Sequence, residues 1–143
     1  MSQFSRFMKA NKIVKKNEFY APTVSLVDEE EKPLLWEFKH LTSKENEDIR
    51  ESCTYEVQIT GKPNSFRHKM NTSLYLAKMI CASVVAPDLY DAQLQDSYGV
   101  KTPEELLFAL VDDPGEYNDL GVWMQNFQGF NKGLDEKVEE AKN

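Results

Sequence analysis

The sequence is poor in the residues that build most catalytic and metal sites. Its 143 residues include only two cysteines, two histidines and six glycines. Cys53 and Cys81 lie far apart and belong to no CxxC or cysteine–histidine pattern, so we expect reduced structural thiols. The glycines form no phosphate-binding loop. These absences argue against redox, zinc-dependent and nucleotide-dependent enzymes, and we expect no cofactor and no bound metal.

Long hydrophobic runs are also missing. No stretch approaches the ~20 apolar residues that a transmembrane helix requires. The first residues are basic, but Phe4, Phe7 and Met8 are interrupted by polar residues, unlike the apolar centre of a signal peptide. We therefore expect a cytoplasmic protein without a membrane partner.

Charged residues are abundant but unevenly distributed along the chain, and the net charge is −7. Five cations precede the first acid: Arg6, Lys9, Lys12, Lys15 and Lys16. Residues 88–119 carry one base, Lys101, and these acids: Asp88, Asp91, Asp96, Glu104, Glu105, Asp112, Asp113, Glu116 and Asp119. Because affinity for nucleic acid depends on neutralising phosphates, the acidic half argues against such a partner. It is either a solvated surface or a face for a basic protein.

The hydrophobic pattern predicts an α+β, predominantly helical fold in a single domain, residues 1–143, with flexible ends at 1–18 and 131–143. An N-terminal β-hairpin is expected to pack on a bundle of about five helices. Its strands are expected over 20–26 and 34–40, where alternation turns Trp36 and Phe38 inward. His40 shares that face and is expected to be a core or edge histidine, since no second metal ligand is suitably spaced.

Three helix starts are marked by capping residues. Thr42 with Glu45 forms a capping box, and the pairs Thr102-Pro103 and Asp113-Pro114 combine an N-cap oxygen with proline at the first helical position. Residues 73–86 are apolar nearly all round, which predicts a central helix surrounded by others.

The remaining segments give weaker signals. Residues 2–10 are predicted to form a short amphipathic helix, and 134–142 a fraying one. Residues 54–71 contain a turn at 61–64, with strand or loop left open on either side. Residues 91–110 have the glycine turn of a helix–turn–helix but lack the cations of a DNA reader, so we interpret them as a helical corner.

No group of residues suggests catalysis. The pairs Glu104/Glu105 and Asp112/Asp113 lie in helix N-terminal signatures, and neither histidine accompanies a nucleophile in a motif. The aromatic stripe near the end of the chain has helical spacing, which fits either burial against the central helix or a groove for a partner helix. Our candidate partner-binding residues are Trp123, Phe127, Phe130, Asp112, Asp113, Glu116 and Asp119.

An ordered set of short runs resembles the XkdN-like phage tail assembly chaperones along nearly the whole chain. The runs are Asp28–Pro33, Trp36–Lys39, Leu41–Arg50, Cys53–Thr54, Ala82–Leu89, Leu94–Val100, Pro114–Tyr117, Gly129–Phe130 and Glu139–Asn143. Two positions depart from the pattern. Glu31 stands where glycine is expected, which leaves open how tight the hairpin turn is. Asn131 stands where an acid is expected, and this does not affect the implied function.

The resemblance implies a non-catalytic tail assembly chaperone that binds the tape measure protein and keeps it soluble until tail tube subunits replace the chaperone. The implied partners are the tape measure protein and the tail tube protein, with self-association left open. The implied place is the cytoplasm of a bacterial host, with the chaperone absent from the finished particle. The competing interpretation is an acidic regulatory protein or DNA mimic that inhibits a basic nucleic-acid-binding protein.

Overall fold

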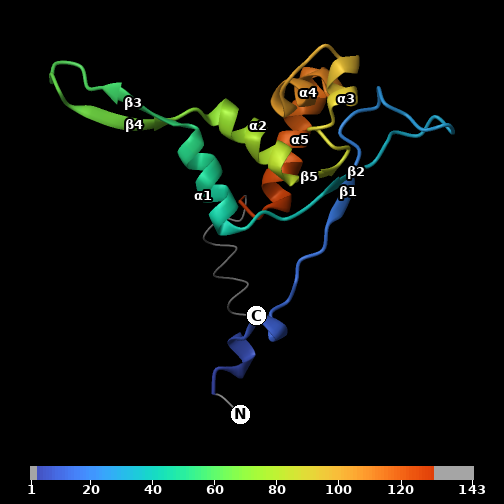
Figure 1. Ribbon diagram of the computed structural model, residues 1–143, viewed down its shortest axis with the longest axis horizontal. Coiled ribbons are helices and arrows are strands. Elements are labelled where there is room, and N and C mark those ends of the chain that lie inside the picture. Colours follow the sequence, from blue (N-terminus) through green and yellow to red (C-terminus); the bar gives the residue numbers. More distant parts are fainter. Residues whose placement is uncertain (1–2, 131–143) are drawn as a thin grey trace.

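The computed structural model describes residues 3–130, which form an α+β fold with five α-helices and two small antiparallel sheets (Figure 1). The helices are α1 Ser43–Ser52, α2 Thr72–Ser83, α3 Ala92–Ser97, α4 Pro103–Leu110 and α5 Pro114–Phe127. The strands are β1 Glu18–Tyr20, β2 Trp36–Phe38, β3 Thr54–Gln58, β4 Phe66–Met70 and β5 Val84–Ala86. The predicted fold class is confirmed.

The N-terminal hairpin forms two of the three strands of the first sheet, whose strand order is β1-β2-β5. Trp36 and Phe38 are both buried, as their alternation predicts. The prediction of the first strand over 20–26 is wrong except at Tyr20, because the strand that pairs with β2 is Glu18–Tyr20 and the chain leaves the ladder before Val24. Pro22 has no N–H to donate to a ladder, which explains the early end.

Helix α2 occupies the centre of the bundle and contacts α1, α4 and α5. Its side chains at Ala77, Met79 and Ile80 are buried in the main core. The predicted helix over 73–86 is too long, because its last three residues instead form β5 and pair with β2. Two β-branched valines and the residue preceding Pro87 disfavour helical geometry there, and pairing with β2 satisfies their backbone.

All three predicted helix starts are confirmed. Thr42 and Glu45 form the reciprocal capping box of α1, and accepting the Thr42 N–H holds the pKa of the Glu45 carboxyl below its usual value. Thr102 caps α4 through the N–H of Glu105, and Asp113 caps α5. Each cap accepts an amide hydrogen that the first helical turn would otherwise leave unpaired.

The turn of the first hairpin is closed despite lacking glycine. Glu31 adopts φ +64°, a left-handed conformation that normally favours glycine. Its N–H donates to the Asp28 carbonyl at 3.0 Å, and the Asp28 N–H donates to the Lys32 carbonyl at 2.8 Å. The departure from the family pattern therefore costs backbone strain without opening the turn.

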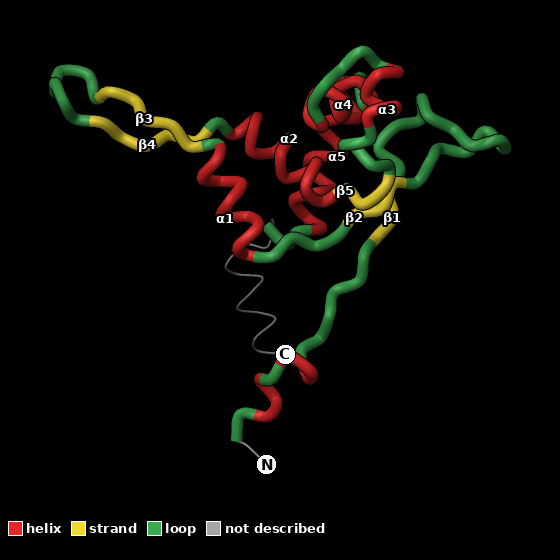
Figure 2. Tube along the Cα trace, viewed as in Figure 1, coloured by secondary structure: helices red, strands yellow, loops and turns green. Residues whose placement is uncertain are grey.

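The second hairpin, β3–β4, resolves the segment that the sequence left open. Its five residue pairs run from Thr54 opposite Met70 to Gln58 opposite Phe66. No residue of either strand is buried. In Figure 2 the hairpin projects beyond α1 and α2 instead of covering the helices.

The N-terminal residues 3–17 extend away from the helical body (Figure 1). The predicted helix over 2–10 is wrong for the described part of this range, which forms two single 3₁₀ turns, Ser5–Phe7 and Lys9–Asn11. Met8 between them is extended. An isolated amphipathic helix this short is marginal without a surface to pack against, which explains the difference. The predicted helix over 134–142 lies outside the described residues.

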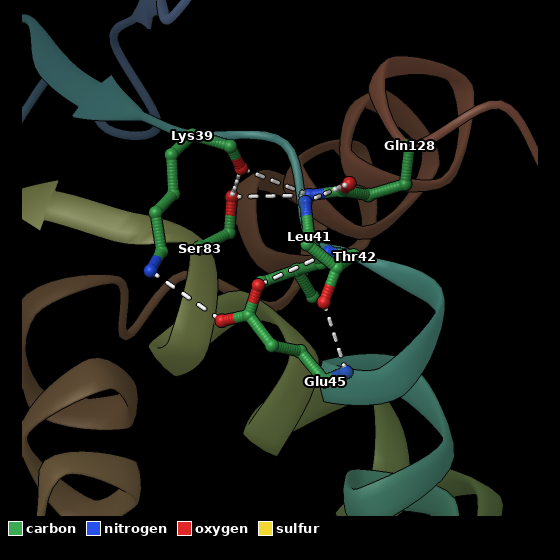
Figure 3. A network of polar contacts seen from close by, with 6 residues as sticks. All are labelled: Lys39, Leu41, Thr42, Glu45, Ser83 and Gln128. Atoms are coloured by element: carbon green, nitrogen blue, oxygen red, sulfur yellow. Dashed lines mark hydrogen bonds and ion pairs between the residues drawn. The ribbon is translucent and has the colours of Figure 1, made fainter. Parts of the chain in front are cut away.

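A polar junction fixes the end of α5 against the segment that follows β2 (Figure 3). The Gln128 amide nitrogen donates to the Lys39 carbonyl at 3.2 Å and to Ser83 Oγ at 3.1 Å. Its carbonyl oxygen accepts the Leu41 N–H at 2.9 Å. Ser83 Oγ in turn donates to the Lys39 carbonyl at 2.6 Å. The Gln128 side chain thus joins three segments, and it sets the position of Gly129 and Phe130, which follow it in the chain.

Candidate partner-binding site

Two of the three predicted aromatic residues belong to a stack between α5 and the first sheet. The Trp123 ring lies 4.6 Å from that of Tyr20 and 4.9 Å from that of Phe127, both nearly parallel, and it tilts against Phe38 at 4.9 Å. Phe127 also stacks on His40, with ring centres 4.0 Å apart. His40 is therefore an aromatic contact at the edge of the core, as predicted. Trp123 and Phe127 hold α5 on the hairpin.

Of the four predicted acids, two accept hydrogen bonds within the fold and the other two lie on the surface. Asp113 caps α5 through the amides of Gly115 and Glu116. Glu116 accepts hydrogen bonds from Thr23 Oγ1 at 2.7 Å and from the Val24 N–H at 2.8 Å, which fixes the chain after β1. Asp112 and Asp119 lie on the surface.

The negative charges of two of these acids also affect Tyr20, a member of the aromatic stack. Partial burial raises the pKa of the Tyr20 hydroxyl, and the negative charges of Asp119 and Glu116 raise it further. Tyr20 therefore stays neutral at physiological pH and stacks on Trp123 without introducing a charge.

The structure does not bring the whole predicted set together. Asp112 and Asp113 precede α5, whereas Phe130 follows it, and the helix between them has 14 residues. At 1.5 Å per residue, the acids and Phe130 lie about 21 Å apart along the helix axis. A partner that touches both groups must run along α5 for its full length.

Phe130 faces a different surface from Trp123 and Phe127. Its backbone is set by Gly129, whose φ of +85° ends α5 and lets the Phe130 N–H donate to the Gln125 carbonyl at 2.9 Å. Its side chain is 51% exposed and lines a pocket of about 490 Å³ beside α2. The lining of this α2–α5 pocket is Met70, Thr72, Ser73, Tyr75, Leu76, Met79, Gln125 and Phe130.

A second apolar pocket was missed by the sequence analysis. It has a volume of about 360 Å³ and lies where the β1–β2 loop meets β5 and α3. Leu35, 65% exposed, stands at its rim, and we call it the Leu35 pocket. Its lining is Leu26, Leu34, Leu35, Trp36, Ala86, Pro87, Leu94, Tyr98 and Leu110. The available signal was the Leu34-Leu35 pair, since strict alternation buries only one of two neighbours.

The described residues offer no arrangement that resembles an active site. Burial, with a smaller contribution from the charge of Glu104, raises the pKa of the Cys81 thiol to about 12, so it stays protonated and unreactive. Cys53 is likewise buried, and both thiols are free. Within residues 3–130, no three histidine, cysteine or acidic side chains gather as metal ligands. No helix in the same range is long and apolar enough to cross a membrane.

A family model for the phage XkdN-like tail assembly chaperone proteins matches residues 4–142. The chain belongs to this family. The family is non-catalytic, in agreement with the interpretation that the chain is not an enzyme. Membership also favours a role in tail assembly over the alternative of an acidic inhibitor or DNA mimic.

The fold is shared with a solved structure. The crystal structure of the protein YqbN superposes with a TM-score of 0.74, covering 92% of this chain and 99% of that chain at 18% sequence identity. No curated protein matches the sequence. This tail assembly chaperone therefore shares the fold of YqbN at low sequence identity.

Proposed function

We propose that this tail assembly chaperone binds the tape measure protein through the α2–α5 pocket and keeps it soluble in the bacterial cytoplasm during tail assembly. The observation that carries the proposal is an open apolar pocket on a member of this family. Tail tube protein then displaces the chaperone, which is absent from the finished particle. A tape measure protein is long and helical, so the client is an amphipathic helix.

The pocket suits such a helix in size and chemistry. Leu76, Met70 and Phe130 present apolar surface, and methionine adapts its shape to different apolar side chains. Ser73 and Gln125 supply polar contacts at the edge. One apolar anchor of the client, inserted beside Phe130, supplies most of the affinity, as hot-spot residues do at interfaces.

The acids at the other end of α5 have a different role. A helix that runs along α5 from Phe130 first meets Asp119, within α5, and then Asp112, which lies beyond the far end of the helix, about 21 Å away along its axis. Both acids are exposed. These charges orient and accelerate the approach of basic residues on the client more than they add affinity. Trp123 and Phe127 support the site by holding α5 in place.

The test compares two phenylalanines of equal exposure. Phe130 is 51% and Phe108 is 49% exposed. We expect Phe130→Ala to weaken binding of a soluble tape measure fragment by ~1 kcal/mol or more, with the melting temperature nearly unchanged. Phe108→Ala, on α4, should leave binding unchanged. Calorimetry measures the affinity, and co-expression measures how much of a longer, aggregating fragment remains soluble.

Two outcomes contradict the proposal. If co-expression with the wild-type protein leaves the tape measure fragment as insoluble as it is alone, the protein is not a chaperone for this client. If wild-type and Phe130→Ala proteins bind equally well, the client does not use the α2–α5 pocket. Trp123→Ala is unsuitable for this purpose, because removing that ring disrupts the stack that holds α5 on β1 and β2.

A further inference from the structure

Residues 3–17 form an arm with the composition of a binding segment. The arm has five cations and no acid. Ile13 and Val14 lie in its extended part, just before β1, and are 90% and 83% exposed. Lys12 precedes this pair, and Lys15 and Lys16 follow it. Two adjacent apolar side chains exposed to this extent are available for contact with another molecule.

No partner for the arm's charges is present in the part of the chain that the structure describes. The ion pairs found in residues 3–130 involve Lys32, Lys39, Lys44 and Arg50, none of which belongs to the arm. The arm's positive charge is therefore available to a surface of opposite sign.

The Leu35 pocket is such a surface. Acids lie close in sequence to its lining residues on every segment: Asp28, Glu29, Glu30 and Glu31 between Leu26 and Leu34, Asp88 after Pro87, Asp91 and Asp96 around Leu94, and Asp112 after Leu110. The neighbouring cations are few, and Lys32 already pairs with Glu30 at 3.6 Å. An apolar pocket with acidic surroundings selects an apolar segment with basic neighbours, which describes residues 12–16.

We propose that the Leu35 pocket of one chaperone binds the Ile13-Val14 pair of a second copy, with Lys12, Lys15 and Lys16 meeting the surrounding acids. The inference does not depend on the identity of the client. The Leu35 pocket is separate from the α2–α5 pocket. Within the arm, Lys15 lies near Phe130, with which it lines a cavity of about 270 Å³ beside α1, whereas Ile13 and Val14 do not line that cavity.

The strand register makes the contact intermolecular. Trp36, which lines the pocket, pairs with Tyr20 at the end of β1. The arm joins β1 at the opposite end, where Glu18 pairs with Phe38. From there it continues away from the body, as Figure 1 shows. To reach its own pocket the arm would have to reverse and pass back along β1, whereas a second copy can present its arm directly.

Arm and pocket are different surfaces, so each copy keeps one of each. Such a heterologous contact either closes into a ring, becomes mutual in a dimer that exchanges arms, or extends as a row. In every case an arm variant retains a functional pocket, and a pocket variant retains a functional arm. This complementarity is what the experiment uses.

Sedimentation velocity of the full chain over a range of protein concentrations tests the contact. We expect the wild type to associate in a concentration- and salt-dependent manner, weaker at high salt. Ile13→Asp and Leu35→Asp should each weaken association at least tenfold, and both positions are exposed enough to accept the change without unfolding. Phe66→Asp, on the β3–β4 hairpin, is the matched control and should associate as the wild type does.

The decisive step mixes the two impaired variants. An Ile13→Asp chain offers its pocket to the arm of a Leu35→Asp chain, so the mixture should regain dimers that neither variant forms alone. Monomeric wild type at all concentrations, unchanged association in either variant, or no recovery on mixing would overturn the proposal. Binding of a tape measure fragment by monomeric variants would still support the proposed function, so the two failures are distinguishable.

Discussion

The two β-hairpins have similar local structures and opposite relations to the core. In β1–β2, Trp36 and Phe38 are buried beneath α5 and the strand pairs also with β5. In β3–β4, five residue pairs form a longer ladder in which no side chain is buried. Ladder length therefore does not decide which hairpin stabilises the fold. Burial does, because apolar area removed from water supplies most of the free energy of folding.

The comparison also separates stability from association. The buried apolar residues lie mainly in the helical body and the first sheet, although Phe108, Val122 and Phe130 of the body are about half exposed. The arm, the β1–β2 loop and the second hairpin have many exposed apolar residues: Phe7, Ile13, Val14, Val24, Leu34, Leu35, Tyr55 and Phe66. A family whose members escort another protein needs apolar surface that folding does not use. This chain has such surface on its projecting segments and at Phe130, beside the α2–α5 pocket.

The largest expected effect comes from the buried hairpin. Phe38→Ala removes a ring that is 0% exposed and contacts Trp36 and Trp123. We expect a loss of about 3–5 kcal/mol in the free energy of unfolding, since the change leaves a cavity in the centre of the core. Urea unfolding followed by circular dichroism measures it. A loss below ~1 kcal/mol would mean that the first sheet is not part of the core.

The turns of the two hairpins allow a second test, in which the expected change in stability is smaller and its direction is also predicted. The first turn places Glu31 at φ +64°, whereas the second uses Gly61 at +80° and Asn64 at +66°. Both of the latter residue types tolerate this conformation better than glutamate does. We expect Glu31→Gly to stabilise the protein by about 0.5–1 kcal/mol, the relief of strain less the added freedom of the unfolded chain.

Glu29, two residues before Glu31 in the same turn, supplies the control for this prediction. Glu29 has no positive φ, so Glu29→Gly adds unfolded-state freedom without relieving strain and should destabilise slightly. The two substitutions remove the same charge from the same turn. Equal effects of the same sign in thermal unfolding would show that charge, and not backbone conformation, governs this turn.

The sequence predicts what depends on nearby residues. The capping box at Thr42 and the proline-started helices at 103 and 114 are local hydrogen-bond patterns, and the structure has all three. The alternation that buries Trp36 and Phe38 is equally local. The turn at Gly99, with φ +69° between α3 and α4, forms the predicted helical corner.

What the sequence does not predict depends on distant partners. Val84–Ala86 continues an apolar helical pattern and becomes a strand only because β2 offers it a ladder. The strands of β3–β4 do alternate, with Tyr55 and Val57 in one and Phe66 and Met70 in the other, but neither face is buried. The pattern therefore does not show how this hairpin is placed relative to the core. The Leu35 pocket is assembled from four separate segments, so no single run of residues indicates it. The division of the aromatic stripe, with Trp123 in the stack and Phe130 at another pocket, is also set by tertiary packing.

The smallest expected effect completes the comparison of hairpins. Phe66 is a strand phenylalanine like Phe38, but it is 57% exposed and pairs with Gln58 at the free end of β3–β4. We expect Phe66→Ala to change the free energy of unfolding by less than ~0.5 kcal/mol, because little apolar area is lost from contact. The measurement is the same urea titration as for Phe38→Ala, repeated at two protein concentrations. A loss above ~1.5 kcal/mol that disappears on dilution would mean that the hairpin is buried against another copy, and stability would then reside in the assembly as well as in the fold.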